Sequence, residues 1–313
     1  MSLHIFGAVV TAPGCAANNR GETEGNITTL QKILWQDQVH TTVSAEAIRW
    51  ALRYYWQRAN TFEVNRRWQD DKEDHEWQDP NWQGWSEENG TIYIDDDLLG
   101  FMRAEGAKTE GVEDTGGSRG KRAKGTVNKR RGVLEVTRAI STTPYAGDIS
   151  FNAKSGEKGR TSLYGTEMHA TRYQYGFALT PERLRNKKHC LPALDGLANL
   201  GEVAGNHSRF LFDFSPESIV LRLTADPAPR ILYCFQDNHG SIIAPELIRK
   251  VKANDLNPQE LYIGGKIASL PEIQDLQTRV CVPGVKEAVA EFNKAVEEEL
   301  KKAAKEKSEH KDD

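Results

Sequence analysis

The chain has 313 residues, long enough for one elaborated domain or two small ones, and its 38% hydrophobic and 27% charged residues are ordinary for a folded protein. The formal net charge of -4 argues against a surface that attracts nucleic acid everywhere. The four cysteines are far apart and indicate neither a zinc site nor a disulfide scaffold, and neither a signal peptide nor a membrane span is recognisable, so we expect a cytoplasmic protein without a cofactor.

Charge is unevenly distributed along the chain. Basic residues crowd the stretch 118–131, whereas acidic residues crowd the stretches 70–76 and 95–97. A locally basic surface on an acidic protein is therefore expected.

The first sixty residues predict a strand, a polar loop and a helix. Residues 3–12 form an apolar run that ends at a Pro-Gly pair, which is typical of a buried strand, and residues 18–32 are rich in turn-forming residues. Residues 44–58 predict a helix with Ser44 as its N-cap. Helical spacing defines an apolar stripe for the core and a separate polar stripe: Ile48, Leu52, Tyr55 and Ala59 in the first, and Glu46, Arg49, Arg53 and Gln57 in the second.

Residues 61–132 are expected to be an insertion. Its four tryptophans lie in a polar setting, before a strand-like stretch at 91–94 and a helix-like stretch at 96–104. From about 105 to 132 apolar residues almost vanish. Burial there cannot offset the entropy of ordering the chain, so we expect a mobile basic loop.

Two strands, a helix and a hairpin are expected after the insertion. Residues 133–141 and 172–179 predict strands separated by a second polar stretch. The Thr-Pro-Glu sequence at 180–182 predicts the start of a helix, which is followed by an apolar helical face running to Val203. Alternating apolar residues at 210–223 predict a hairpin.

Without the two polar stretches, the expected order is strand, helix, strand, strand, helix, hairpin. This order matches the split βαβ, ferredoxin-like arrangement of RNA-recognition (RRM) domains, in which helices cover one face of an antiparallel sheet. The predicted fold class is therefore α+β.

Four stretches resemble the DevR-type Cas-seven family of type I-B CRISPR systems: residues 15–57, 138–156, 169–179 and 202–224. The resemblance implies an α+β fold shaped like a hand, with an RRM-like palm at 1–60 and 172–280, fingers inserted at 61–132, and a strand plus thumb hairpin at 133–171. A charged helical tail at 284–313 would follow. It also implies a non-catalytic backbone subunit of the Cascade surveillance complex. Its copies would oligomerise along the guide RNA (crRNA), contact other Cascade subunits and present the guide to target DNA.

The resemblance further implies which residues contact RNA. They are expected in the loop after the first strand, around the first helix, in the thumb and in a glycine-containing loop: Asn18, Asn19, Arg20, Thr28, Gln31, Lys32, His40, Ser44, Arg49, Arg53, Arg138, Phe151, Lys154, Arg160, Met168, Gly205, Asn206, His207 and Arg209. Structural alternatives stay open for many of them. Ser44 could only cap its helix, Arg49 and Arg53 could pair with acids of the fingers, and Phe151 and Met168 could belong to a small satellite core.

No catalytic motif is recognisable, since the chain has neither a phosphate-binding loop nor a zinc-protease pair of histidines. The run Asp95–Asp97 could ligate a metal ion, although acidic runs are usually solvent-facing or cap helices. We expect no metal site and no enzyme. Two other functions stay open: a stand-alone RRM-like RNA-binding protein, and a metal-dependent RNase subunit of a related complex, for which Glu22 and Glu24 are the acids near the first strand. The sequence does not distinguish nuclease-based defence from guided transposition.

Overall fold

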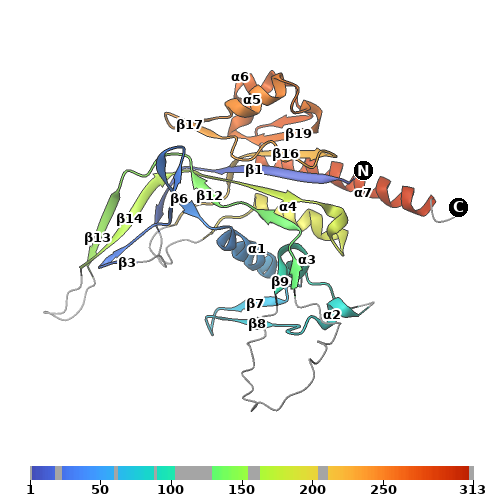
Figure 1. Cartoon of the computed structure of the whole chain (residues 1–313), viewed down its shortest axis with the longest axis horizontal. Helices are drawn as coiled ribbons and strands as arrows, with labels where there is room; N and C mark the ends of the chain where they lie inside the picture. Colours follow the sequence, from blue (N-terminus) through green and yellow to red (C-terminus); the bar gives the residue numbers. More distant parts are fainter. Residues whose placement is uncertain are drawn as a thin grey trace, which may run out of the picture.

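The computed structural model describes residues 2–17, 23–59, 63–87, 90–102, 129–153, 163–203 and 211–309. It has a mixed α+β architecture, with a large main sheet, helices on both of its faces, and an arm that projects from one end (Figure 1). None of the helices within these ranges is long and apolar enough to cross a membrane.

The main sheet contains nine strands: β1 (His4–Thr11), β5 (Lys32–Trp35), β6 (Gln38–Val43), β11 (Leu134–Val136), β12 (Ala139–Ser141), β15 (Tyr173–Leu179), β16 (Pro216–Thr224), β19 (Leu261–Gly265) and β20 (Val280–Val282). Their order is β20-β19-β16-β1-β15-β12-β6-β5, and β11 also pairs with β15. β1 lies antiparallel between β15 and β16. The predicted strands at 3–12 and 172–179 are therefore confirmed.

Helices α1 (Ala45–Ala59), α4 (Cys190–Ala198) and α7 (Val285–Glu309) pack on one face of this sheet. The N-cap at Ser44 is confirmed, because the backbone N–H of Ala47 donates to Ser44 Oγ at 3.1 Å. The predicted apolar stripe is partly wrong at its C-terminal end. Trp56 is fully buried and donates from Nε1 to the Pro192 carbonyl at 3.0 Å, whereas Ala59 is exposed.

The other face of the sheet is covered by residues 225–277. This cover contains β17 (Gln236–Asn238), β18 (Ser241–Ile243), α5 (Pro245–Lys252) and α6 (Pro271–Gln274), with short 3₁₀ turns η3 (Pro258–Glu260) and η4 (Lys266–Ser269). Phe6, Ala8 and Val10 of β1 pack against it, whereas Ile5 and Val9 point to the helices. β1 is thus buried on both faces, which explains its continuous apolar run.

The arm is a separate sheet of five strands: β2 (Gly14–Ala17), β3 (Thr23–Glu24), β4 (Ile27–Thr28), β13 (Asp148–Ala153) and β14 (Leu163–Thr171). β13 and β14 form an antiparallel hairpin, and β14 also pairs with β2 and, in parallel, with β4. Figure 1 shows the arm extending away from the main sheet. The polar loop predicted at 18–32 is partly wrong, because residues 23–24 and 27–28 join this sheet and β5 begins at Lys32.

The insertion packs beside α1. It contains β7 (Arg66–Gln69), β8 (Asp74–Trp77), α2 (Gln83–Ser86), α3 (Ile94–Leu99), β9 (Gly100–Met102) and β10 (Lys129–Arg131). The strand predicted at 91–94 is wrong, because α3 already begins at Ile94. The prediction of a mobile loop at 105–132 is wrong for residues 129–131, which form β10 and pair with β9. Residues 105–128 lie outside the described residues.

Two further predictions need correction. The turn at 180–182 forms only η1 (Pro181–Arg183), followed by η2 (Lys187–His189), and α4 ends at Ala198 rather than near Val203. The hairpin at 210–223 is wrong: residues 211–215 form no strand. The apolar residues at every second position in this stretch have another cause: the rings of Phe212 and Phe214 are both buried against Tyr173.

Candidate nucleic-acid interface

Six of the predicted RNA-contacting residues come together where the main sheet meets the arm, a region that we call the junction. Lys32 lies on β5 opposite Thr41 of β6, and β6 pairs with β12, which follows Arg138 directly. Thr28 lies on β4 beside Thr166 of β14. The junction therefore gathers residues far apart in sequence: Thr28, Gln31, Lys32, His40, Arg138 and Met168.

Lys32 is held by an acid that the sequence reasoning missed. Its Nζ lies 2.5 Å from Glu167 Oε2 and 5.0 Å from the centroid of the Tyr145 ring. Glu167 also accepts the backbone N–H of Leu30 at 2.7 Å. Burial and the neighbouring Glu167 raise the pKa of Tyr145 to about 12, so its hydroxyl stays protonated and neutral at physiological pH. Lys32 thus ties β5 to the arm, and its charge is largely balanced.

Arg138 offers a different arrangement. Its side chain is exposed, and Nη1 donates to Gln31 Oε1 at 3.1 Å and to Thr42 Oγ1 at 3.2 Å. Among the described residues it pairs with no carboxylate. The guanidinium is therefore positioned by neutral partners and keeps its full charge, which is what a phosphate-binding arginine requires.

Below this surface, the junction is closed by a buried polar network. His40 is only 6% exposed, and its Nδ1 lies 2.8 Å from the Ser141 carbonyl oxygen. Thr41 Oγ1 lies 2.7 Å from His169 Nδ1 and 2.9 Å from the Tyr173 hydroxyl. Burial lowers the pKa of His169, and the neighbouring His40 acts in the same sense, although a backbone hydrogen bond at Pro144 acts in the opposite sense. His40 therefore joins β6 to β12 and is not presented to an RNA strand in this arrangement.

Exposed apolar side chains follow one face of the arm. Phe151 and Leu163 are 76% and 65% exposed, and Ile149 is 40% exposed. The register Ile149↔Glu167, Phe151↔Gly165 and Ala153↔Leu163 places them on the same face. Met168 pairs with Asp148 and lies on the opposite face, half-buried. The two apolar residues that we selected in the arm therefore do not act on one surface.

Arg49 and Arg53 point away from the junction, into the insertion. Arg53 Nε lies 3.1 Å from Asp95 Oδ2, and Arg49 donates to the Leu99 carbonyl oxygen. Gln57 of the same stripe binds the backbone of Trp68 through both of its side-chain polar atoms, each at 2.8 Å. Pairing with an acid of residues 61–132 is therefore observed for Arg53, whereas Arg49 binds a backbone carbonyl oxygen instead. RNA contact by either residue stays a prediction.

The acidic run Asp95–Asp97 is buried rather than solvent-facing and forms the first turn of α3. Asp95 accepts the backbone N–H groups of Asn65 and Arg66 at 2.7 and 3.1 Å. Asp96 accepts Asn65 Nδ2 at 2.8 Å and Trp82 Nε1 at 3.1 Å. Burial and the adjacent Asp95 raise the pKa of Asp96 to about 7.

Asp97 connects α3 to β10 and to the turns that precede α4. Its carboxylate accepts from Arg130 Nη2 at 2.8 Å and from the backbone N–H groups of Arg185 and Asn186 at 3.0 Å each, and it lies 3.0 Å from His189 Nδ1. Burial alone would raise its pKa, but these hydrogen bonds outweigh burial and lower the pKa. No group of three His, Cys, Asp or Glu side chains among the described residues is arranged to hold a metal ion.

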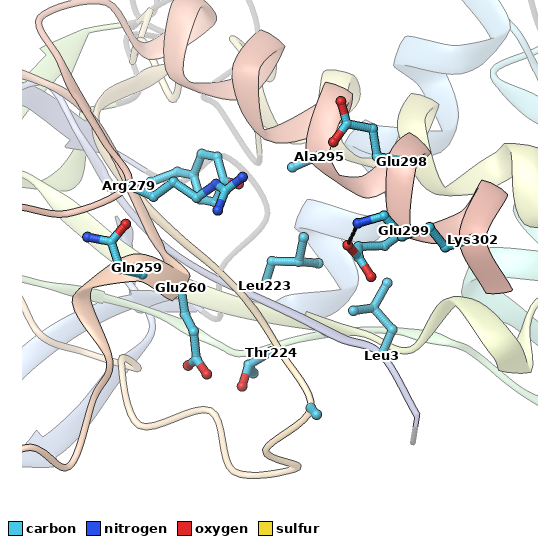
Figure 2. Close-up of a pocket in the computed structure, with 12 residues that line it drawn as sticks. Leu3, Leu223, Thr224, Gln259, Glu260, Arg279, Ala295, Glu298, Glu299 and Lys302 are labelled. Carbon is cyan, nitrogen blue, oxygen red and sulfur yellow. Dashed lines mark hydrogen bonds and ion pairs between the residues drawn. The ribbon is translucent and has the colours of Figure 1, made fainter.

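Nine predicted contacts lie outside the described residues: Asn18, Asn19, Arg20, Lys154, Arg160, Gly205, Asn206, His207 and Arg209. A separate cavity of about 400 Å³ lies between Leu223 and Thr224 of β16, η3 and α7 (Figure 2). None of the predicted residues lines it. Two of its charged groups pair with each other, in the 2.8 Å contact between Lys302 Nζ and Glu299 Oε1.

Comparisons with known proteins were made for sequence and for structure. No protein-family model matches the chain. A Myxococcus xanthus (strain DK1622) protein named CRISPR-associated protein Cas7/Cst2/DevR is 53% identical over 279 residues, covering 85% of this chain and 88% of that protein. Two solved chains named CRISPR RNA-guided surveillance complex, one of them in a pre-nicking state, have TM-scores of 0.53 and 0.52 at 13% and 10% identity. They cover 93% and 92% of this chain, and 100% and 99% of their own, so they share its fold.

Proposed function

Because the chain belongs to the Cas7/Cst2/DevR family of CRISPR-associated proteins, we propose that it is a cytoplasmic, non-catalytic backbone subunit of a CRISPR surveillance complex. In this role it binds guide RNA, oligomerises along it with copies of itself, contacts other subunits and presents the guide to target DNA. The observation that carries the RNA-binding part is Arg138, an exposed guanidinium without a carboxylate partner among the described residues, beside the hydroxyl of Thr42. Phosphate and sugar contacts of this kind are the usual sequence-independent ones.

The strand order supports an RRM-like palm. Around β1 the order is β16-β1-β15-β12, and α1 and α4 lie on the same face, which is the arrangement of a ferredoxin-like unit. We assign the palm to residues 1–60 and 172–280, the fingers to 61–132, and the strand and thumb to 133–171, whose hairpin β13–β14 builds the arm.

A stand-alone RRM-like protein is the less favoured alternative. An RRM reads bases with aromatic residues on the open face of its sheet. Here Phe6, Ala8 and Val10 on that face of β1 are each at most 4% exposed, because residues 225–277 cover them. RNA would therefore bind at the junction and the arm instead. The RNase alternative depends on Glu22 and Glu24, of which Glu22 lies outside the described residues and Glu24 lies exposed on β3. Incubating the assembled complex with matched RNA and Mg²⁺ distinguishes it from the proposed function, because only an RNase subunit would cleave the RNA.

The first prediction concerns Arg138→Gln. We expect guide RNA to bind about tenfold more weakly at 0.1 M salt, and the slope of log K against log salt to fall by about 0.7, the value for one phosphate contact on a single strand. Fluorescence anisotropy with a labelled guide over a salt series measures both. Arg67→Gln, which removes another exposed arginine from β7, serves as the matched control. An Arg138→Gln curve that superimposes on the control curve would rule out this contact.

A further inference from the structure

A second cationic surface lies where β10 meets the turns before α4. Seven basic residues fall in the stretches 129–131 and 183–188, which we call the β10 patch. Direct contacts hold the two stretches together. Asp97 binds both Arg130 Nη2 and the backbone N–H of Arg185, and Arg130 Nη2 also donates to the Arg183 carbonyl oxygen at 3.1 Å. The patch is therefore a fixed array on the folded part of the chain.

The patch has an excess of positive charge. Its nearby acids are Asp97, which is buried, Glu182, which accepts from the Leu3 N–H and Ser2 Oγ, and Glu135, which pairs with Arg131 and lies 3.8 Å from Arg183. The side chains of Arg131 and Arg183 are 74% and 44% exposed. Three further cations have no ion-pair partner in the described part of the chain: Lys129, Lys187 and Lys188.

The chemistry of the patch favours a phosphate backbone over exposed bases. The ring of Trp85 packs against the patch and is already contacted by Arg130 Cζ at 4.2 Å and Arg185 Cζ at 5.0 Å. The side chain of Asn186 accepts from the Lys188 N–H and lies against His189. Proteins that bind single strands pair charge with free aromatic faces, and base reading requires free amides or guanidiniums in a groove. The patch offers neither the free ring nor the free amide, and each of its four guanidiniums already contacts Glu135 or the Trp85 ring.

We propose that the β10 patch binds the phosphate backbone of double-stranded DNA, without regard to its sequence. The choice of DNA over an acidic protein as the partner rests on the proposed function, in which the complex meets a duplex target. The surface is separate from the junction, because η1 and η2 follow the Leu179 end of β15, whereas β12 of the junction pairs at the Tyr173 end of the same strand.

The test replaces the three lysines that have no ion-pair partner among the described residues, in the variant Lys129→Gln/Lys187→Gln/Lys188→Gln. Its matched control, Lys252→Gln/Lys294→Gln/Lys302→Gln, removes the same charge from α5 and α7. Binding of each full-length chain to a random-sequence 30-base-pair duplex is measured from 50 to 200 mM salt. We expect the slope of log K against log salt to fall by up to about 2.7, at about 0.9 for each phosphate that is no longer neutralised, with at least a tenfold loss of affinity at 0.1 M salt.

Guide RNA and polyglutamate are titrated in parallel with the duplex. Unchanged guide affinity in the variant, together with weakened duplex binding, supports a separate DNA surface. Equal duplex affinity and slope in the variant and the control would overturn the proposal, and so would a loss confined to polyglutamate. A wild-type chain that binds the duplex through these lysines but ignores guide RNA would refute the proposed function and leave this inference intact.

Discussion

Asp97→Ala is expected to destabilise the fold by about 3–5 kcal/mol, the typical result of removing one partner from a buried ion pair. The side chain is fully buried and accepts from four groups on β10, on the segment 185–186 and on η2. Alanine would leave all four donors without this acceptor, and water does not reach them readily. Chemical denaturation followed by circular dichroism measures the loss of unfolding free energy.

Two controls make this prediction specific. Asp71→Ala removes an exposed carboxylate and should change stability by less than about 0.5 kcal/mol. Asp96→Asn keeps an acceptor for Asn65 or Trp82 and should be much milder than Asp97→Ala at pH 7. If Asp97→Ala unfolds at the same denaturant concentration as Asp71→Ala, the insertion is not anchored through Asp97.

The two aspartates should respond to pH in opposite directions. The folded-state pKa of Asp96, about 7, exceeds its unfolded value, so its stabilising contribution is complete below about pH 4 and is lost as the pH rises to 7. Asparagine does not titrate. The free energy of unfolding of the Asp96→Asn variant should therefore rise relative to that of the wild type as the pH increases over this range, by at most about 1.4 kcal/mol per pH unit. The pKa of Asp97 is lowered, so its contribution is present above its unfolded pKa and is lost as the pH falls through its folded pKa.

Phe151→Ala combined with Leu163→Ala is expected to weaken binding of guide RNA strongly while leaving the fold intact. Stacking of a base on an aromatic side chain contributes about 1–3 kcal/mol, equivalent to roughly a 5- to 150-fold change in affinity. Both side chains are mostly exposed on one face of the arm, so their loss removes little buried surface. Anisotropy with a labelled guide measures the affinity, and the melting temperature checks the fold.

The matched control for this pair is Leu34→Ala with Met102→Ala. Both of its side chains are 72% exposed, and they lie on β5 and β9 rather than on the arm. The control should bind guide RNA as the wild type does. Equal losses in the two double variants would show that general surface apolarity, rather than the arm face, governs binding.

Local sequence patterns predicted the elements whose structure depends on near neighbours. The apolar run of β1, the N-cap of α1, its stripe as far as Leu52 and the alternation of β15 each follow from patterns within about fifteen residues. Pairing across the chain was not predictable in this way. Residues 23–28 were expected to form a loop, because their polar composition carries no sign of the edge that β14 offers more than a hundred residues later.

In the candidate site too, contacts between residues far apart in the sequence could not be predicted. The resemblance selected Gln31, Lys32 and Arg138, which do lie together, but the partner that ties down Lys32 is 135 residues away. Likewise, the sequence could not decide whether Arg53 meets a phosphate or an acid, since Asp95 is 42 residues distant. A run of three aspartates usually indicates a solvated loop, and only the donors around it explain why this one is buried.

Assembly of this chain in register along a guide RNA can be measured by native mass spectrometry on guides of increasing length. We expect the number of bound copies to rise by one for each constant increment of RNA length, with bound copies accumulating side by side on long guides. A single bound copy at every guide length, or a monomer that ignores added guide, would contradict the proposed assembly.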